Sequence, residues 1–217
     1  MKITLLLFIL IAAAITRIPI VGKYFSIVNT LIHELGHAFM AILTGGRVDK
    51  IQLFSNTEGT AWTSNRFWFG RVLTSVAGYV FASLVSCVFL YFISVQKYNF
   101  ILYTLVFFLV IALLFWVRNL YGLFWMATFC TIFGLLIWYD QETLTMYVLL
   151  FICATIFVQS IYSAWVILYL SFKTPSNAGD ASNLAKFTFI FPTQIWGIFF
   201  SLQSLYFGFL GLSFIYL

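Results

Sequence analysis

Both histidines of the chain lie in the segment Thr30-Leu31-Ile32-His33-Glu34-Leu35-Gly36-His37-Ala38-Phe39-Met40, which is otherwise mostly apolar. On a helix, residues four apart project from the same face, so His33 and His37 can direct imidazole nitrogens at one zinc ion. Glu34 is turned by about 100° from His33, where its carboxylate can accept a proton from a water molecule at the metal. A hydrogen-bonded structural cluster and a metal-free relic of such a site are the alternative interpretations. Gly36 is expected to let a neighbouring backbone or a substrate approach closely.

The composition indicates a protein that crosses a membrane several times. Of 217 residues, 63% are hydrophobic and 8% are charged, and the mean hydropathy is +1.05, far from the values of soluble domains. We expect residues 1–217 to form a single domain embedded in the lipid bilayer. The net charge of +5 does not indicate nucleic acid, because the basic residues are scattered at segment ends, where they suit lipid headgroups. The three cysteines lie in apolar segments and are expected to be small buried residues.

Apolar segments of about 20 residues, the length that crosses a bilayer, recur along the chain. We therefore expect an all-α polytopic membrane protein with six to seven transmembrane helices. The expected helices cover residues 3–20, 25–44, 67–94, 100–117, 120–139, 144–170 and 192–217. Gly45-Gly46 is expected to end the second helix, and Ala77-Gly78-Tyr79 contributes to a stripe of small residues on the third.

Residues 47–65 predict a short β-hairpin after the second helix. Apolar and polar residues mix along this segment, and Ser55-Asn56-Thr57-Glu58-Gly59 is typical of a turn. An ordinary surface loop is the alternative. A hairpin here would lie close to the histidine helix, where an exposed edge strand could pair with an unwound polypeptide.

Seven alternating spans would distribute the basic residues unevenly between the two sides of the membrane. Eight fall on one side and three on the other; the eight are Lys2, Arg47, Lys50, Arg66, Arg71, Arg118, Lys173 and Lys186. Because cytoplasmic loops are enriched in lysine and arginine, we expect the N-terminus, the hairpin and the loop around Asp180 to be cytoplasmic.

A catalytic zinc usually has three protein ligands and an open position for water. Asp140 and Glu142 fall on the side of the membrane opposite to the hairpin, so they are poor candidates for the third ligand. Asp49 and Glu58 belong to the hairpin and are expected to be solvated. Asp180 is favoured, because it lies on the hairpin side among small residues and its loop could fold back into a cavity. The alternative role for Asp180 is the N-cap of a short helix.

These motifs, taken in order, resemble the site-2 protease family of intramembrane zinc metalloproteases, most closely its compact branch without PDZ or CBS domains. The resemblance is carried by His33-Glu34-Leu35-Gly36-His37, the polar hairpin, Val76-Ala77-Gly78-Tyr79, and Ser176-Asn177-Ala178-Gly179-Asp180-Ala181. It implies zinc ligands at His33, His37 and Asp180 and a general base at Glu34.

Two further positions are candidate substrate contacts, Gly78 and Asn119. Arg118-Asn119 is similar to the compact branch, and substrate contact, oxyanion stabilisation and helix capping are all open as its role. The chain departs from better-studied members in two places: Gly78 is followed by Tyr79 instead of proline, and Asp180 is followed by Ala181 instead of glycine.

Together with this resemblance, the chemistry predicts a zinc-dependent intramembrane endopeptidase that hydrolyses peptide bonds in or near transmembrane segments of membrane proteins. The expected cofactor is Zn²⁺, and the expected partners are the lipid bilayer and a transmembrane protein substrate. The protein should be an integral multi-pass protein, in the cell membrane if it is bacterial. The alternatives are an inactive pseudoprotease that binds transmembrane helices and a transporter of metal or solute. The sequence shows no internal repeat of the kind that transporters often have.

Overall fold

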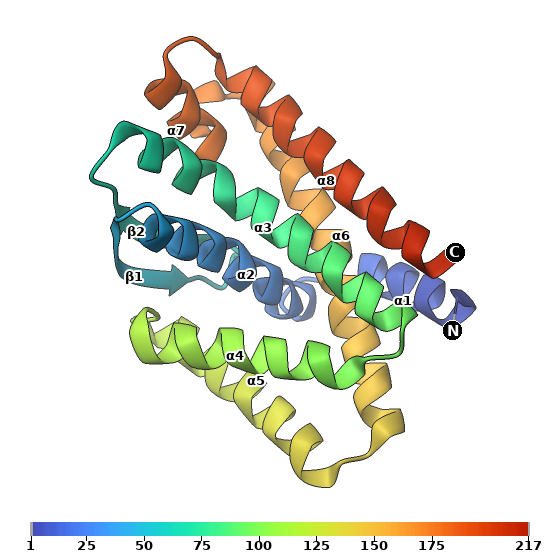
Figure 1. The fold of residues 1–217 in the computed structure, drawn as a ribbon. Helices are drawn as coiled ribbons and strands as arrows, with labels where there is room; N and C mark the ends of the chain where they lie inside the picture. Colours follow the sequence, from blue (N-terminus) through green and yellow to red (C-terminus); the bar gives the residue numbers. More distant parts are fainter. Residues whose placement is uncertain (1, 217) are drawn as a thin grey trace.

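The computed structural model of the chain describes residues 2–216 and is built from helices and one two-stranded hairpin (Figure 1). The elements are α1 (Lys2–Ile15), α2 (Val21–Leu43), β1 (Arg47–Leu53), β2 (Gly59–Ser64), α3 (Trp68–Ser94), α4 (Tyr98–Phe115), α5 (Leu120–Tyr139), α6 (Glu142–Lys173), the 3-10 turn η1 (Pro175–Asn177), α7 (Gly179–Thr188) and α8 (Thr193–Tyr216). Six helices are long and apolar enough to cross a membrane, namely α2, α3, α4, α5, α6 and α8. The expected class, a helical membrane protein with a hairpin after the second helix, is confirmed.

The first helix is shorter than expected. The apolar segment 3–20 predicted one continuous helix, but α1 ends at Ile15. The chain turns at residues 16–20, where Pro19 has no N–H to donate and Ile20 has a positive φ of 70°. At 1.5 Å per residue the 14 residues of α1 extend about 21 Å, less than the roughly 30 Å of a hydrocarbon core.

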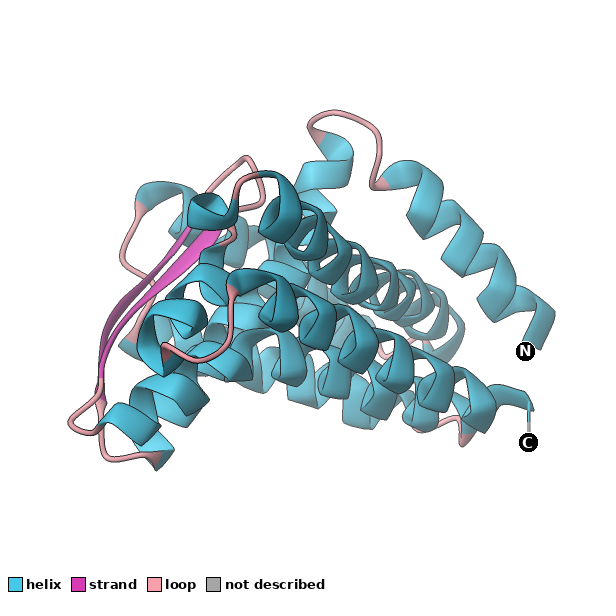
Figure 2. Ribbon diagram, turned by 90° about the horizontal axis from the view of Figure 1, so that it is seen from above, coloured by secondary structure: helices cyan, strands magenta, loops and turns pink. Residues whose placement is uncertain are grey.

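The start of α1 lies at the end of the molecule that also holds the C-terminus, away from the hairpin (Figures 1 and 2). Along its length α1 packs against α6, where the ring of Phe8 stacks on that of Tyr147. The expectation that the N-terminus shares the side of the hairpin assumed that the first helix spans the membrane, and α1 is shorter than that assumption requires.

The hairpin is fastened to the helices through one of its two strands. β1 pairs with β2 in antiparallel fashion, and on its other edge Ile51 forms a parallel bridge with Val117, in the connection between α4 and α5. The Ile51 amide donates to the Trp116 carbonyl at 2.8 Å. β2 has no strand partner on its outer edge among residues 2–216. The hairpin therefore has one anchored edge and one free edge.

α2 and α3 form the centre of the bundle and pack closely against each other. In Figure 1, α4 and α5 lie on one side of this pair, and α7 and α8 lie on the other. α2 ends as expected at glycine: Gly45 has φ of +74°, and the Gly46 amide donates to the Ala41 carbonyl at 2.8 Å. The histidine face of α2 meets the small residues of α3, since a Cβ on Gly78 would touch both histidine rings.

Candidate metal centre

The two histidines of α2 direct the same ring nitrogen at one point. His33 Nε2 and His37 Nε2 are 3.0 Å apart. The His37 ring is oriented by its other nitrogen, Nδ1, which lies 2.6 Å from the Thr74 carbonyl oxygen on α3. A carbonyl can only accept, so Nδ1 carries a proton and Nε2 is the nitrogen left for a metal ion. A metal-binding histidine is commonly oriented in this way, through the ring nitrogen that does not bind the ion.

Asp180 completes the cluster from a distant part of the sequence. Its Oδ2 atom lies 3.3 Å from His33 Nε2 and 3.2 Å from His37 Nε2. Three donor atoms at the corners of a tetrahedral zinc site with bonds of about 2.1 Å lie roughly 3.4 Å apart, so the observed spacing fits that ion. Among the described residues this is the one group of three or more histidine, cysteine or acidic side chains with metal-ligand spacing.

Local packing seats Asp180 in this position. α7 begins at Gly179, which has φ of +50°, and Ala178 and Ala181 are fully buried against α6 and α3. Ala178, not Asp180, is the N-cap of α7, so the alternative capping role is wrong. Burial raises the pKa of the Asp180 carboxyl, but His37 and His33 beside it outweigh burial and hold that pKa below its ordinary value. The carboxylate is therefore ionised, as a metal ligand must be.

Glu34 lies directly below the start of β2. Its side chain is 4% exposed, and a Cβ built on Gly59 would lie 2.5 Å from Glu34 Oε1. The hairpin is held at this level by Thr30, whose hydroxyl donates to the Thr57 carbonyl at 2.8 Å. Glu34 therefore sits between the histidine pair and the free edge of β2.

Two glycines allow this arrangement. A Cβ on Gly36 would lie 2.8 Å from the Ala77 carbonyl oxygen, so Gly36 lets the backbone of α3 approach α2 as expected. A Cβ on Gly78 would lie 2.5 Å from His37 Nε2 and 2.6 Å from His33 Nε2. Gly78, predicted as a candidate substrate contact, thus lies against the metal-binding atoms, where only a residue without a side chain fits.

Asn119, the other candidate substrate contact, serves the hairpin. Its carboxamide donates to the Leu53 carbonyl at 2.6 Å and accepts from the Leu53 amide at 3.1 Å. It is not part of the cavity wall beside the histidines. Arg118 donates to the carbonyls that end α4, including that of Leu114 at 2.8 Å. The pair therefore anchors β1 and caps α4.

A cavity of about 1120 Å³ opens beside the cluster. Its walls come from α2, the hairpin, α3, α6 and α7, and they carry many hydroxyl and amide groups. Of the other acidic candidates, Glu58 lines this cavity but is exposed at the hairpin turn, and Asp49 is exposed on β1. Two contacts of the histidines were not predicted from the sequence. The Thr74 carbonyl that orients His37 is a backbone group, so no residue type signals it. The ring of Tyr79 packs edge-on against that of His33, with 4.4 Å between the ring centroids.

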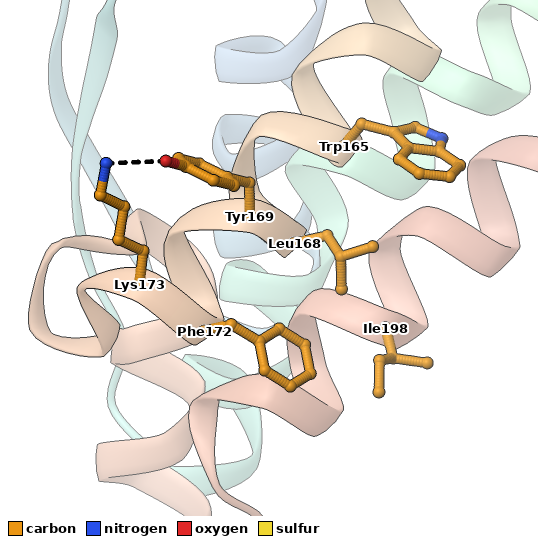
Figure 3. A pocket seen from close by; sticks show the side chains of 6 residues that line it. All are labelled: Trp165, Leu168, Tyr169, Phe172, Lys173 and Ile198. Carbon is orange, nitrogen blue, oxygen red and sulfur yellow. Dashed lines mark hydrogen bonds between the residues drawn. The ribbon is translucent and has the colours of Figure 1, made fainter.

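A second hollow lies between α6 and α8 and is apolar (Figure 3). Its lining residues are Trp165, Leu168, Tyr169, Phe172, Lys173 and Ile198. Lys173 donates to the Tyr169 hydroxyl at 2.7 Å at one end. This lining contains no histidine or carboxylate, so the metal chemistry belongs to the first cavity.

Comparison with known proteins agrees with this geometry. A family model described as Peptidase M50B-like matches residues 6–211. None of the curated proteins and none of the solved structures matches the chain. The match covers the histidine motif of α2, Asp180 and all six candidate spans except the last residues of α8. The chain therefore belongs to the Peptidase M50B-like family of membrane proteases, within the site-2 protease family that its motifs resemble.

Proposed function

We propose that the protein is a zinc-dependent endopeptidase that cuts peptide bonds in or near transmembrane segments of other membrane proteins. The observation that carries this proposal is the convergence of three donor atoms, at separations of 3.0 to 3.3 Å, beside the buried carboxylate of Glu34. His33, His37 and Asp180 would hold the ion. A zinc ion supplies a Lewis acid that activates water and polarises a carbonyl group.

The residues of the chain supply the proton transfers. The Glu34 carboxylate is placed one residue after a ligand on α2, so it faces the same point from the side. It would take a proton from the attacking water and return it to the departing amine, which leaves the cleaved peptide as a free acid and a free amine. Its burial below β2 excludes bulk water from the carboxylate.

The free edge of β2 is the proposed holder of the substrate. Thr60, Ala61, Thr63 and Ser64 line the cavity along this edge. A helical substrate satisfies its own backbone, so it must unwind before a carbonyl can reach the metal site. Pairing with an edge strand offers new partners to the N–H and C=O groups that unwinding frees.

We also propose that the hairpin end of the molecule faces the cytoplasm. Seven of the basic residues belong to that end, namely Arg47, Lys50, Arg66, Arg71, Arg118, Lys173 and Lys186. With Lys2 at the opposite end of the molecule, the hairpin end still has more of the eleven basic residues than the other end. The positive-inside rule therefore favours a cytoplasmic hairpin end.

The test is the Glu34→Gln substitution in the full-length protein. The probe is a set of synthetic transmembrane peptides with a helix-breaking Asn-Gly pair, each labelled with a fluorophore and a quencher. We expect the zinc-loaded wild type to cleave a member of the set, and the variant to lose cleavage while it keeps its zinc. Glu58→Gln is the matched control, because Glu58 lines the same cavity but is exposed. Cleavage by Glu34→Gln at the wild-type rate would contradict the proposed mechanism.

A further inference from the structure

Two carboxamide side chains in the cavity have no hydrogen-bond partner among the described residues. Asn29 on α2 is 5% exposed, and its Oδ1 atom is buried and unsatisfied. Gln159 on α6 is half-buried, and its carboxamide forms no hydrogen bond with residues 2–216. Both residues line the cavity that contains the metal cluster. Their helices are two of the candidate membrane spans.

Neighbouring polar side chains in the same part of the cavity are already satisfied. Ser26 donates to the Gly22 carbonyl at 2.7 Å, and Thr30 donates to the Thr57 carbonyl at 2.8 Å. An unpaired amide inside a membrane protein is unfavourable, because lipid offers it no partner. Asn29 and Gln159 are therefore carboxamides on the cavity wall that can accept a partner from outside the chain.

Their position relative to the metal cluster defines what they can reach. Asn29 precedes His33 by one helical turn, about 6 Å along α2. Gly179, next to the ligand Asp180, lies against Ile167 of α6: a Cβ built on Gly179 would be 3.6 Å from the Ile167 side chain. Ile167 therefore marks the level of the metal cluster on α6. Gln159 precedes Ile167 by eight residues, or about 12 Å along the helix. Both helices run toward the hairpin end. Asn29 and Gln159 thus lie on the side of the cluster that is farther from the hairpin and deeper in the membrane.

The same chain shows how a carboxamide holds an extended backbone. Asn119 accepts from the Leu53 amide and donates to the Leu53 carbonyl, and so pairs with one residue as a neighbouring strand would. A carboxamide has an oxygen that accepts and a nitrogen that donates, so it can pair with both the N–H and the C=O of a single unwound residue. Asn29 and Gln159 both line the cavity with this group unpaired; the Asn29 Oδ1 atom is covered, so that side chain must turn about its own bonds to reach a ligand in the cavity.

We propose that Asn29 and Gln159 form a carboxamide subsite that hydrogen-bonds the unwound backbone of the substrate on the membrane-embedded side of the scissile bond. This rests on the proposed function, since it assigns a place to the deeper half of a transmembrane substrate. The free edge of β2 takes the half nearer the hairpin. Backbone recognition of this kind is independent of side-chain sequence, so the subsite selects for a segment that can unwind.

The test measures binding and not cleavage. Full-length protein carrying Glu34→Gln is titrated in detergent micelles with two fluorescent peptides. One is a complete apolar transmembrane segment with an Asn-Gly pair, and the other is the same peptide truncated two residues beyond that pair on its membrane-embedded side. We expect the complete peptide to bind more tightly. Asn29→Leu or Gln159→Leu should weaken its binding about tenfold each, the scale of a lost buried hydrogen bond, and change the binding of the truncated peptide less than about twofold.

Stability separates this role from a structural one. Replacing an unsatisfied buried amide by leucine removes no native hydrogen bond, so Asn29→Leu should not lower the thermal midpoint. If leucine proves too large, Asn29→Ala gives the same comparison. Gln203→Leu is the comparison variant: the Oε1 atom of Gln203 is buried without a partner like Asn29 Oδ1, but its Nε2 donates to the Ser83 hydroxyl at 3.2 Å and to the Phe200 carbonyl at 3.0 Å, so its loss should lower the thermal midpoint.

Any result other than selective weakening of the complete peptide would contradict the proposed subsite. Equal weakening of both peptides by Asn29→Leu and Gln159→Leu would indicate that these amides hold water or shape the cavity. Unchanged binding, equal binding of the two peptides by the parent protein, or no binding at all would also refute it. A failure of proteolysis is detected separately, because it appears as an inactive wild type whose Glu34→Gln variant can still be titrated.

Discussion

Replacing Gly78 with alanine is expected to disable the metal centre while α3 stays folded. A Cβ at this position would lie 2.5 Å from His37 Nε2 and 2.6 Å from His33 Nε2, where ordinary contact begins near 3.4 Å. The imidazoles must therefore retreat by about 0.9 Å, several times the 0.2 Å tolerance of metal–ligand distances. We expect zinc affinity to fall at least about 100-fold, or about 2.8 kcal/mol. Helix propensity favours the change by about 1 kcal/mol, so it opposes unfolding of α3.

The assay is zinc retention by purified protein during dialysis against increasing concentrations of a chelator, with circular dichroism as the measure of helix content. Gly134→Ala is the matched control, because it also lies inside a membrane helix and a Cβ there meets nothing within 4 Å. The control should keep its zinc at wild-type chelator concentrations. If Gly78→Ala also keeps its zinc, the histidine rings are not held against α3, and the reasoning from this close approach is wrong.

The remaining predictions concern the third ligand and the two anchors of the hairpin. Asp180→Asn removes an ionised oxygen donor and should lower the zinc affinity in the same chelator series; unchanged metal content would point to another ligand. Thr30→Val removes the donor to the Thr57 carbonyl, about 1 kcal/mol, so hairpin amides should exchange hydrogen faster; equal exchange rates would show that this bond does not hold the turn. Asn119→Leu leaves the Leu53 amide and carbonyl unpaired and should lower the free energy of unfolding by about 1–3 kcal/mol, measured by denaturation in detergent, with normal zinc content.

The membrane helices could be predicted from sequence because each depends on local composition. Whether a segment forms one continuous helix cannot be read from its hydropathy, as α1 shows. Residues 3–20 are apolar enough to lie in lipid, but Pro19 cannot donate a backbone hydrogen bond, and Ile20 takes a positive φ. Hydropathy reports the solvent that a segment tolerates, whereas the break at residues 16–20 depends on backbone geometry. The predicted side of the N-terminus depended on one continuous first helix, which this break interrupts.

The candidate site could be predicted only in part, because some of its residues are brought together by local helix spacing and others by packing between distant segments. The pairing of His33 with His37 follows from the period of one helix. Asp180 could be nominated by its small neighbours, but its distance from the histidines depends on how α7 packs. The role of Asn119 could not be inferred, because its partner Leu53 is 66 residues away and is bonded through backbone atoms that carry no sequence signal.

The close spacing of the donor atoms at this centre depends on glycine and alanine residues, whose small size lets the helices approach. Three helices must bring their backbones close enough for donor atoms to lie 3.0 to 3.3 Å apart, and each does so at a glycine or alanine: Gly36 on α2, Gly78 on α3 and Ala181 on α7. In lipid, where no hydrophobic force draws apolar helices together, such close contact is a main source of association. The residues that stabilise the bundle are therefore those that position the ligands, and substitutions that enlarge them should affect metal binding before they affect the fold.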